Sequence, residues 1–370
     1  MNKKCFIRSL IYIITFFGLL NTQILYSQSN YLFNDSHFHL TNYIQEGITV
    51  QDYLKIMDNK VGRSTLFGIP VQQMWSYGNS GEYAPTYYLQ SDAPLYYYSF
   101  TDAFIAMQYK SLSATDQKRF DPMITGFNPA DMYAAEHIKR VLETFPGVFS
   151  GIGEFSIHKE FVSSKIAGGV ASLTNPALDS ILNFCAEVGL VVILHSDMDM
   201  PMAKKGTDPV YLNQMKELFR RNPNTTIIWA HVGLGRIVYP AGYGSSNNPE
   251  RSTKHLDIVE EILKDPAFKN VYFDISWDEV AKYIVSSPQA IKNTAEVMEE
   301  FPDRFLFGTD VVAPPTQDFY LGVYNMYQPL WDMLSKNTKE KLLLSNYERI
   351  FDKARADVRA WEKENVLMNK

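Results

Sequence analysis

The stretch FNDSHFHL at residues 33–40 places two histidines, His37 and His39, two positions apart in an apolar setting. In a β-strand, residues i and i+2 point to the same face, so both imidazoles can converge on one point. Two convergent neutral imidazoles make half of a divalent-metal site. A pair of histidines on the polar face of a half-buried strand has the same pattern, so the remaining ligands must be sought later in the chain.

The chain has 370 residues, a formal net charge of -6 and 46% hydrophobic residues, which is a globular composition. This length suits one large α/β barrel or two ordinary domains. The mild acidity argues against a broad nucleic-acid-binding surface, which would be basic. We therefore expect a small-molecule substrate and no nucleic-acid partner.

The first residues have the pattern of a secretory signal. Three basic residues are followed by an almost wholly apolar run at 10–20 and a small-residue cleavage site after Ser27. We predict a signal peptide over 1–27, a single mature domain over 28–370, and a secreted or periplasmic protein without a stable membrane anchor. An uncleaved N-terminal anchor is the alternative. Cleavage would leave Cys185 as the only cysteine, so the mature protein would have no internal disulfide.

Short apolar runs alternate with helical patterns along the rest of the chain. The predicted strands are 33–40, 64–71, 120–126, 149–157, 191–196, 226–232, 271–276 and 304–311. The predicted helices include 130–144, 176–188, 210–221, 256–264 and 288–300. Uninterrupted apolar strands are typical of parallel sheets buried on both faces. Eight such units predict a closed (β/α)8 TIM barrel, of the α/β class. An open doubly wound sheet is disfavoured, since no Gly-rich phosphate loop follows the first strand.

Two regions exceed a minimal barrel. Residues 72–113 form a predicted insertion after strand two, and 317–364 are predicted to form two long C-terminal amphipathic helices. The insertion is dense in aromatic residues, namely Trp75, Tyr77, Tyr83, Tyr87, Tyr88, Tyr96, Tyr97, Tyr98 and Phe100. An insertion after a barrel strand falls on the catalytic face, which makes Trp75 a candidate substrate contact. The alternative is that these aromatics only pack the insertion against the barrel.

Four predicted strands end in a side chain that can bind a metal: Glu154 on strand four, His195 on strand five, His231 on strand six and Asp310 on strand eight. A polar residue at the C-terminal end of a barrel strand points into the active-site mouth. Each histidine taken singly could be a hydrogen-bonded core residue. The combination with the His-x-His pair favours a metal site.

This set of motifs resembles the metal-dependent hydrolases of the amidohydrolase superfamily, in particular the amidohydrolase-related group, over residues 33 to about 351. The resemblance implies that His37, His39 and Asp310 hold one divalent ion, with Zn²⁺ expected. His195 and His231 would hold a second ion or share the first with the substrate. Glu154 stands where many members carry a carboxylated lysine, and a carboxylate can bridge two cations. One or two ions are therefore compatible with the sequence.

The resemblance implies a metal-activated water that hydrolyses an ester, lactone, amide or phosphoester bond of a small molecule. Asp310 would accept and return the proton, and His231 would be a second electrophile. Arg236, in the loop after strand six, and Asp274, at the end of strand seven, are further candidate substrate contacts. A metal-dependent decarboxylase of an aromatic or unsaturated acid is the alternative, and a non-catalytic binding protein is a third. The sequence leaves the substrate, the metal number and any homo-oligomer open.

Overall fold

The computed structural model describes residues 31–166, 171–203, 208–236 and 254–368. The predicted signal peptide lies outside the described residues. Tyr31–Lys370 form one compact unit. None of the described helices is long and apolar enough to span a bilayer.

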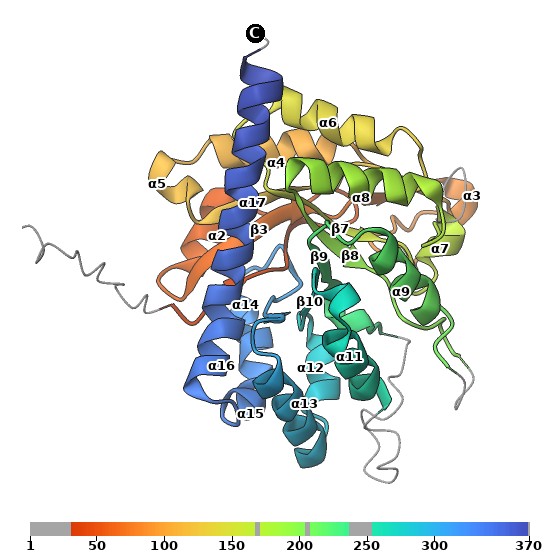
Figure 1. Cartoon of the computed structure of the whole chain (residues 1–370). Helices are drawn as coiled ribbons and strands as arrows, with labels where there is room; N and C mark the ends of the chain where they lie inside the picture. The colour runs from red at the N-terminus through yellow and green to blue at the C-terminus, as the bar shows by residue number, and fades with distance from the viewer. Residues whose placement is uncertain (1–30, 167–170, 204–207, 237–253, 369–370) are drawn as a thin grey trace, which may run out of the picture. The chain divides into compact units, whose positions relative to one another are not determined.

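The unit is built on a curled sheet of parallel strands (Figure 1). Its main path runs in the order β11-β10-β9-β8-β7-β6-β3-β2-β12, with β1 paired to β3. The strands are β1 Phe33–Asp35, β2 Phe38–Thr41, β3 Val61–Gly68, β6 Phe120–Ile124, β7 Gly151–Ser156, β8 Val191–His195, β9 Ile227–Trp229, β10 Val271–Asp274, β11 Phe305–Leu306 and β12 Val311–Val312. Neighbouring strands along the path pair in parallel, as the apolar runs predict.

The two ends of this path lie on one short segment of chain. The N–H of Ile275 donates to the carbonyl of Leu306 (3.0 Å), while the N–H of Asp310 donates to the carbonyl of His37 (2.7 Å). The segment thus joins the last strand to the first and completes the predicted (β/α)8 barrel. The predicted continuous eighth strand, 304–311, is wrong, because Asp310 has a φ of 53°, which a strand does not allow.

Helices surround the sheet (Figure 1). The longer ones are α2 Val50–Met57, α4 Phe100–Lys110, α6 Ala134–Thr144, α8 Pro176–Val188, α9 Leu212–Arg221, α11 Lys254–Lys264, α12 Asp278–Ile284 and α13 Pro288–Glu300. Helix α8 has the predicted bounds for clear local reasons. The Asn175 side chain accepts the N–H of Ala177, Pro176 occupies the first turn, and Gly189 ends the helix with a φ of 84°.

The insertion after strand two is shorter than the predicted 72–113. It contains an antiparallel pair of strands, β4 Val71–Gln73 and β5 Leu95–Tyr97, and a short helix, α3 Tyr77–Ser80. Helix α4, by contrast, packs against β3 and β6 and is the barrel's own helix between strands two and three. Its buried face, which includes Ile105 and Ala106, faces the sheet.

The C-terminal part also differs from the predicted pair of long helices. Helix α14 Gln317–Met326 is followed by a single turn, α15 Gln328–Trp331, with Pro329 in its first turn. A proline cannot donate an interior helix bond, so it starts a new helix. The chain then continues through α16 Lys336–Glu340 and a π-helical turn, Lys341–Ser345, into α17 Asn346–Glu362.

The strands separate two hydrophobic layers. The inner layer joins strand residues to one face of α17 and consists of Phe67, Met123, Val191, Ile193, Ile228, Ala230, Leu306, Tyr347, Ile350, Phe351 and Ala354. Helix α17 reaches the N-terminal ends of the strands, where Arg355 donates to the carbonyl of Phe120 (2.9 Å). It therefore closes that end of the barrel and leaves the C-terminal ends for the polar groups.

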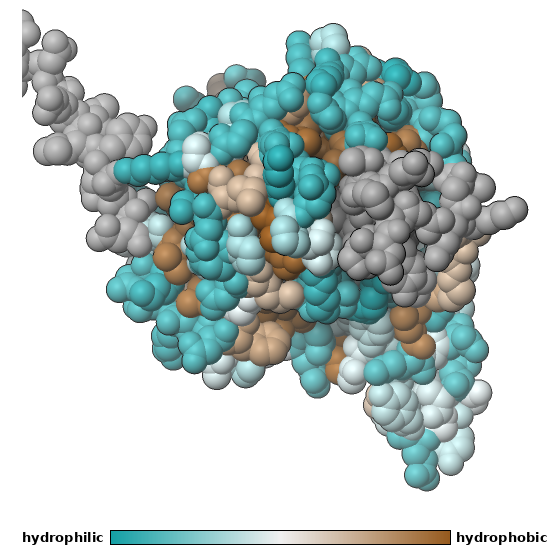
Figure 2. All heavy atoms as spheres, turned by 90° about the horizontal axis from the view of Figure 1, so that it is seen from below, coloured by the Kyte–Doolittle hydropathy of each residue, from teal (hydrophilic) through white to brown (hydrophobic). Residues whose placement is uncertain are grey.

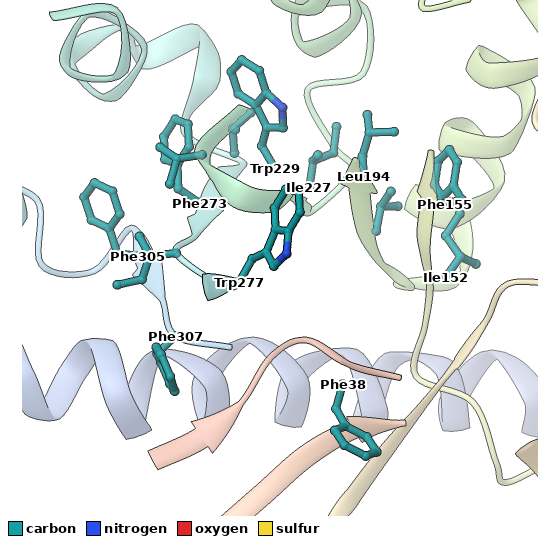
Figure 3. Packing of buried hydrophobic residues seen from close by; sticks show 14 of the residues in the cluster. Phe38, Ile152, Phe155, Leu194, Ile227, Trp229, Phe273, Trp277, Phe305 and Phe307 are labelled. Atoms are coloured by element: carbon teal, nitrogen blue, oxygen red, sulfur yellow. The ribbon is translucent and has the colours of Figure 1, made fainter. Parts of the chain in front are cut away.

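Other strand residues belong to the outer layer. Figure 3 shows side chains of neighbouring strands packed side by side, among them Phe155, Leu194, Trp229 and Phe273. Val192 and Leu194 face outward, while Val191 and Ile193 face inward. The same alternation places His195 on the inner face, beyond the inner hydrophobic layer. Among the coloured residues of the face seen in Figure 2, hydrophilic residues predominate.

Candidate metal centre

Glu154 lies at the centre of a buried cluster on the inner face of the barrel. Its Oε1 is 2.5 Å from Nδ1 of His195 and 3.3 Å from Nε2 of His231. Its Oε2 is 3.5 Å from Nε2 of His39 and 3.7 Å from Nε2 of His37. The two oxygens of one carboxylate therefore face two different pairs of histidines.

The turn of chain before Glu154 depends on a glycine. Gly153 has a φ of 102°, and a Cβ there would lie 2.1 Å from the carbonyl oxygen of Ile193. The pairing register between β7 and β8 shifts between Ile152 and Phe155. This irregularity frees the Glu154 side chain from the strict alternation of the strand.

Asp310 completes one side of the cluster. Its Oδ1 is 2.9 Å from Nε2 of His39 and 3.4 Å from Nε2 of His37. Donor atoms of His37, His39, Glu154 and Asp310 all lie within 4.8 Å of one another, as do those of Glu154, His195 and His231. We call these the first and the second donor group. The structure thus brings together the six predicted metal ligands, and Glu154 is common to both groups.

His37 is oriented by a buried carboxylate. Its Nδ1 is 2.9 Å from Oδ2 of Asp274, and both side chains are fully buried. An ionised carboxylate only accepts, so Nδ1 donates and the lone pair of Nε2 points at Glu154 and Asp310. Among the described residues, that Nε2 has no hydrogen-bond partner. A carboxylate behind a histidine in this way is a common arrangement in metal sites.

His231 is held in the same sense through Ser276. The Ser276 hydroxyl donates to Oδ1 of Asp274 (2.5 Å) and lies 2.9 Å from Nδ1 of His231. Because its single hydrogen is committed to the carboxylate, Ser276 accepts from Nδ1 of His231. The lone pair of the His231 Nε2 then faces Glu154, so the contact favours a ligand rather than the predicted electrophile.

His195 lies between two carboxylates. Its Nε2 is 3.0 Å from Oδ1 of Asp197, and its Nδ1 is 2.5 Å from Oε1 of Glu154. Acceptor lone pairs of His37 and His231 thus face carboxylate oxygens. Such an arrangement requires a cation or a proton between the acceptors. The residues present therefore fit a divalent metal.

The direction of the pKa shift differs among the histidines of the cluster. Burial lowers the pKa of His39 and of His231, which favours their neutral, ligating forms. Burial opposes ionisation of Asp310, but the charge of His37 and the hydrogen bond with His39 outweigh it and hold the pKa of Asp310 below its ordinary value. Burial also opposes protonation of His37, yet Asp274 and Asp310 outweigh it and raise the pKa of His37. A cation bound at His37 would displace that proton.

His231 and Asp310 are not the strand residues that the sequence predicts. Strand β9 ends at Trp229, and His231 has a φ of 57° in the 3-10 turn that follows. The backbone N–H of His231 donates to Oδ1 of Asp274 (3.0 Å). This contact and the bond from Ser276 engage Oδ1 of Asp274, while His37 engages Oδ2. The geometry therefore favours a positioning role for Asp274 over the predicted contact with substrate.

Asp35, the last residue of β1, ties the first strand to the eighth. Its Oδ1 accepts the backbone N–H groups of His37 and Thr309 (both 2.9 Å), and its Oδ2 accepts the hydroxyls of Thr309 and Tyr320 (both 2.7 Å). These bonds hold the chain on both sides of Asp310 close to His37. Asp35 therefore supports the site through the backbone.

The predicted substrate contact Arg236 lies beside the cluster, in a layer of polar and aromatic side chains. Its guanidinium donates to the Tyr87 hydroxyl (2.5 Å), is 3.3 Å from Oε1 of Glu160 and lies 5.2 Å from the centre of the Trp277 ring. Tyr88 donates to the other oxygen of Glu160 (2.6 Å). Two aromatics of the insertion, Tyr87 and Tyr88, therefore reach the polar layer.

Trp75, the other predicted contact, is placed differently. Trp75 is 56% exposed, and its indole N–H donates to the carbonyl of Gly81 within the insertion. The contacts of Ser276 and Asp197 went unrecognised in the sequence. Their signal is spacing: Asp197 follows His195 by two positions, and Ser276 follows Asp274 by two.

A parallel barrel with histidine and carboxylate donors at the C-terminal ends of its strands is an architecture of metal-dependent hydrolases. The chain belongs to the amidohydrolase family, whose model matches residues 35–353. It is an enzyme of the amidohydrolase superfamily, whose members are generally metal-dependent hydrolases.

Solved structures agree on the fold. An amidohydrolase from Burkholderia multivorans superposes with a TM-score of 0.51 at 10% identity, over 87% of this chain and 99% of the other. A dihydroorotase from Campylobacter jejuni has a TM-score of 0.50 at 15% identity, over 89% of this chain and 86% of the other. No curated protein sequence matches the chain.

Proposed function

We propose that the protein uses a divalent metal, with Zn²⁺ as the ion, to hydrolyse an ester, lactone, amide or phosphoester bond of a small molecule. The observation that carries this proposal is the convergence of five other donor residues on Glu154, with the acceptor lone pairs of His37 and His231 directed at carboxylates. Imidazole nitrogens and carboxylate oxygens are the ligands that zinc takes in catalytic sites.

The metal would be held by His37, His39, Glu154 and Asp310, and it would supply a Lewis acid and a water of lowered pKa. The remaining steps belong to the protein. Asp310 has the most exposed side chain of that group, at 8%. Its ionised carboxylate can therefore accept the proton of the attacking water and return it to the leaving group. His231, fixed by Ser276, directs the lone pair of its Nε2 at Oε1 of Glu154 (3.3 Å).

The polar layer beside the cluster suits the rest of the substrate. Arg236 is 40% exposed at its side chain and is already oriented by Tyr87 and Glu160. A preoriented guanidinium binds a carboxylate or phosphate of the substrate in a fixed direction. The aromatic faces of Tyr87 and Trp277 would contact an apolar portion.

The test is turnover in ¹⁸O-labelled water by zinc-loaded protein, with panels of esters, lactones, amides, phosphoesters and aromatic or unsaturated acids. Hydrolysis places one ¹⁸O atom in the product and releases no carbon dioxide. Release of carbon dioxide without a new acid or alcohol group would instead establish the decarboxylase alternative. Zinc-loaded protein inactive on every panel would contradict both.

We also propose export from the cytoplasm, supported by the basic start and apolar run before residue 27. Sequencing the N-terminus of the protein isolated from its native host tests this. A mature chain beginning at Gln28 is expected, and an intact Met1 would contradict cleavage.

A further inference from the structure

A pocket of about 480 Å³ lies beside helix α6, and none of the described residues that line it belongs to either donor group. We call it the α6 pocket. Helix α6 lines it with Ala134, His137 and Arg140, which share one face of the helix because they are three residues apart. Further lining comes from the end of β5, with Tyr96 and Tyr97, and from the loop after β6. Pockets for small molecules commonly measure about 300–1,000 Å³, so this one has room for such a ligand.

The α6 pocket belongs to the outside of the barrel wall. Phe127 lines it, and the ring centre of Phe127 lies 5.1 Å from that of Phe155 on β7. Both rings are part of the outer hydrophobic layer, whereas the metal donors lie on the inner face. The Tyr97 hydroxyl also reaches β7, where it donates to the carbonyl of Ser156 (3.4 Å). The pocket therefore meets β7 through two aromatic side chains and shares no ligand of the proposed metal.

Arg140 gives the α6 pocket an uncommitted positive charge. It is exposed, and its guanidinium has no hydrogen-bond or ion-pair partner among the residues that the structure describes. By contrast, Arg63, Arg220 and Arg355 each pair with a carboxylate. A guanidinium offers a fork of N–H donors that matches a carboxylate or a phosphate. Arg140 is thus free to bind an anionic group of a ligand.

His137, one helical turn before Arg140, is the second polar group of the α6 pocket. Its Nε2 is 3.9 Å from Oδ2 of Asp102, and the two side chains are 30% and 1% exposed. The Asp102 carboxylate accepts the backbone N–H groups of Thr125 (2.8 Å) and Gly126 (3.1 Å), so it is committed to the loop after β6. Nε2 of His137 is buried against that carboxylate. The exposed remainder of the imidazole ring is therefore available to a ligand.

Aromatic side chains surround these polar groups. Tyr96 and Tyr133 line the α6 pocket although they are 42% and 77% exposed. A flat apolar group bound there would cover ring surface that water now contacts. Asp131 is the one acidic residue among the described lining residues, and its Oδ1 is engaged by the backbone N–H of Tyr133 (2.9 Å). The free positive charge of Arg140 therefore favours an anion over a cation.

We propose that the α6 pocket is a second ligand site, which takes a small organic anion that carries an aromatic ring. Arg140 binds the carboxylate or phosphate of this ligand, and Tyr96 contacts its ring. The inference goes beyond the proposed hydrolysis and is independent of it, because the pocket contains none of the metal donors.

The test is calorimetric titration of zinc-loaded and of metal-free protein with four probes. Phenylacetate and phenyl phosphate carry a ring and an anion, acetate has the anion alone, and phenethylamine has the ring with a cation. Arg140→Gln removes the guanidinium at an exposed position, Arg140→Lys keeps the charge, and Tyr96→Ala removes one ring. Arg236→Gln, which changes an arginine beside the metal centre, is the matched control.

We expect phenylacetate or phenyl phosphate to bind more tightly than acetate and phenethylamine, with the same Kd in zinc-loaded and metal-free protein. The tighter of the two identifies the anionic group. Arg140→Gln should raise the Kd about tenfold or more, and Tyr96→Ala should raise it several-fold. Arg140→Lys should restore part of the affinity, and Arg236→Gln should leave the Kd unchanged.

Three results would overturn the inference: no binding of either ring-bearing anion, an unchanged Kd in Arg140→Gln, or tighter binding of phenethylamine. Binding that Arg236→Gln abolishes would also overturn it, since the probe would then occupy the polar layer beside the metal centre. All of these leave the proposed hydrolase untouched. Conversely, zinc-loaded protein that hydrolyses nothing but binds phenylacetate through Arg140 would contradict the proposed function alone.

Discussion

Oδ2 of Asp274 lies 2.9 Å from Nδ1 of His37, and the two side chains are fully buried. The contact fixes which nitrogen of His37 carries the hydrogen, and so it determines the direction of the free lone pair. Asp274 also holds His231: it accepts the backbone N–H of His231 directly, and it contacts the His231 ring through Ser276. One carboxylate thus orients a histidine from each donor group.

Replacing Asp274 with asparagine should weaken metal binding about 10- to 100-fold, because His37 would lose the charged acceptor that orients it. Competition with a chromogenic chelator measures the dissociation constant. Asp278→Asn, a substitution of a partly exposed acid at the start of α12, is the control and should leave the constant unchanged. Equal affinities for the Asp274→Asn variant and the wild type would contradict the orienting role.

Replacing Asp310 with asparagine should lower kcat by about 10²- to 10⁴-fold per bound metal, because an amide cannot accept the proton of the attacking water. The rate must be divided by the metal content of the same sample, since Asp310 is also a predicted ligand. A rate per bound metal within about threefold of the wild type would show that another group accepts the proton.

Replacing Gly153 with alanine should destabilise the fold by about 3 kcal/mol or more, since the new Cβ would collide with the carbonyl of Ile193 and the φ of 102° is unfavourable for alanine. Urea unfolding followed by circular dichroism measures the effect. Gly322→Ala is the matched control, because nothing lies within 4 Å of a Cβ at that position of α14. It should stabilise the protein by about 0.5–1 kcal/mol. Similar midpoints for the two variants would contradict this account of β7.

Acidification should destabilise the protein in part through His158. Burial lowers the pKa of His158 to about 4, against an unfolded value of about 6.5. Its ring stacks on Tyr211 at 3.6 Å, and its Nδ1 lies 2.9 Å from the Ser163 hydroxyl. The unfolded chain therefore binds the proton first. The stability that neutral His158 contributes is present above about pH 6.5 and is lost as the pH falls towards about 4.

The loss attributable to His158 should be at most about 3 kcal/mol. Free energies of unfolding of the wild type and His158→Gln are compared between pH 8 and pH 4. The values at pH 8, where the histidine is neutral in both states, give the baseline. The difference between the proteins should shrink as the pH falls. Parallel curves would show that His158 does not contribute to the acid sensitivity.

Strand periodicity allowed much of the site to be predicted. His195 shares the inward face of Val191 and Ile193 because the three residues alternate along one strand. This relation is a local property of an extended chain, whereas His37 lies in the break between β1 and β2. The apolar runs likewise predicted where the barrel strands lie, since a strand buried on both faces needs little else. The predicted first and eighth strands are each interrupted, between Asp35 and Phe38 and between Leu306 and Val311.

The conformations of His231 and Asp310 could not be predicted in this way. Both residues have positive φ, and each is held by a contact with a distant part of the chain: His231 by Asp274, and Asp310 by the carbonyl of His37. Such turns depend on partners that are close only after folding. The direction of Lys159, whose Nζ lies 3.5 Å from Oε1 of Glu154, is equally hidden, because a long flexible side chain after a strand can point to solvent as readily as inward.

The bond between His39 and Asp310 joins positions that are 271 residues apart in the sequence. The ribosome must therefore complete almost the whole barrel before these donors can meet. On the proposed function, a partly synthesised chain could not capture the metal ion, and a fragment cut anywhere between the two positions would release it once the pieces separate. Intact metal content would thus report on the completeness of each molecule as well as on its activity.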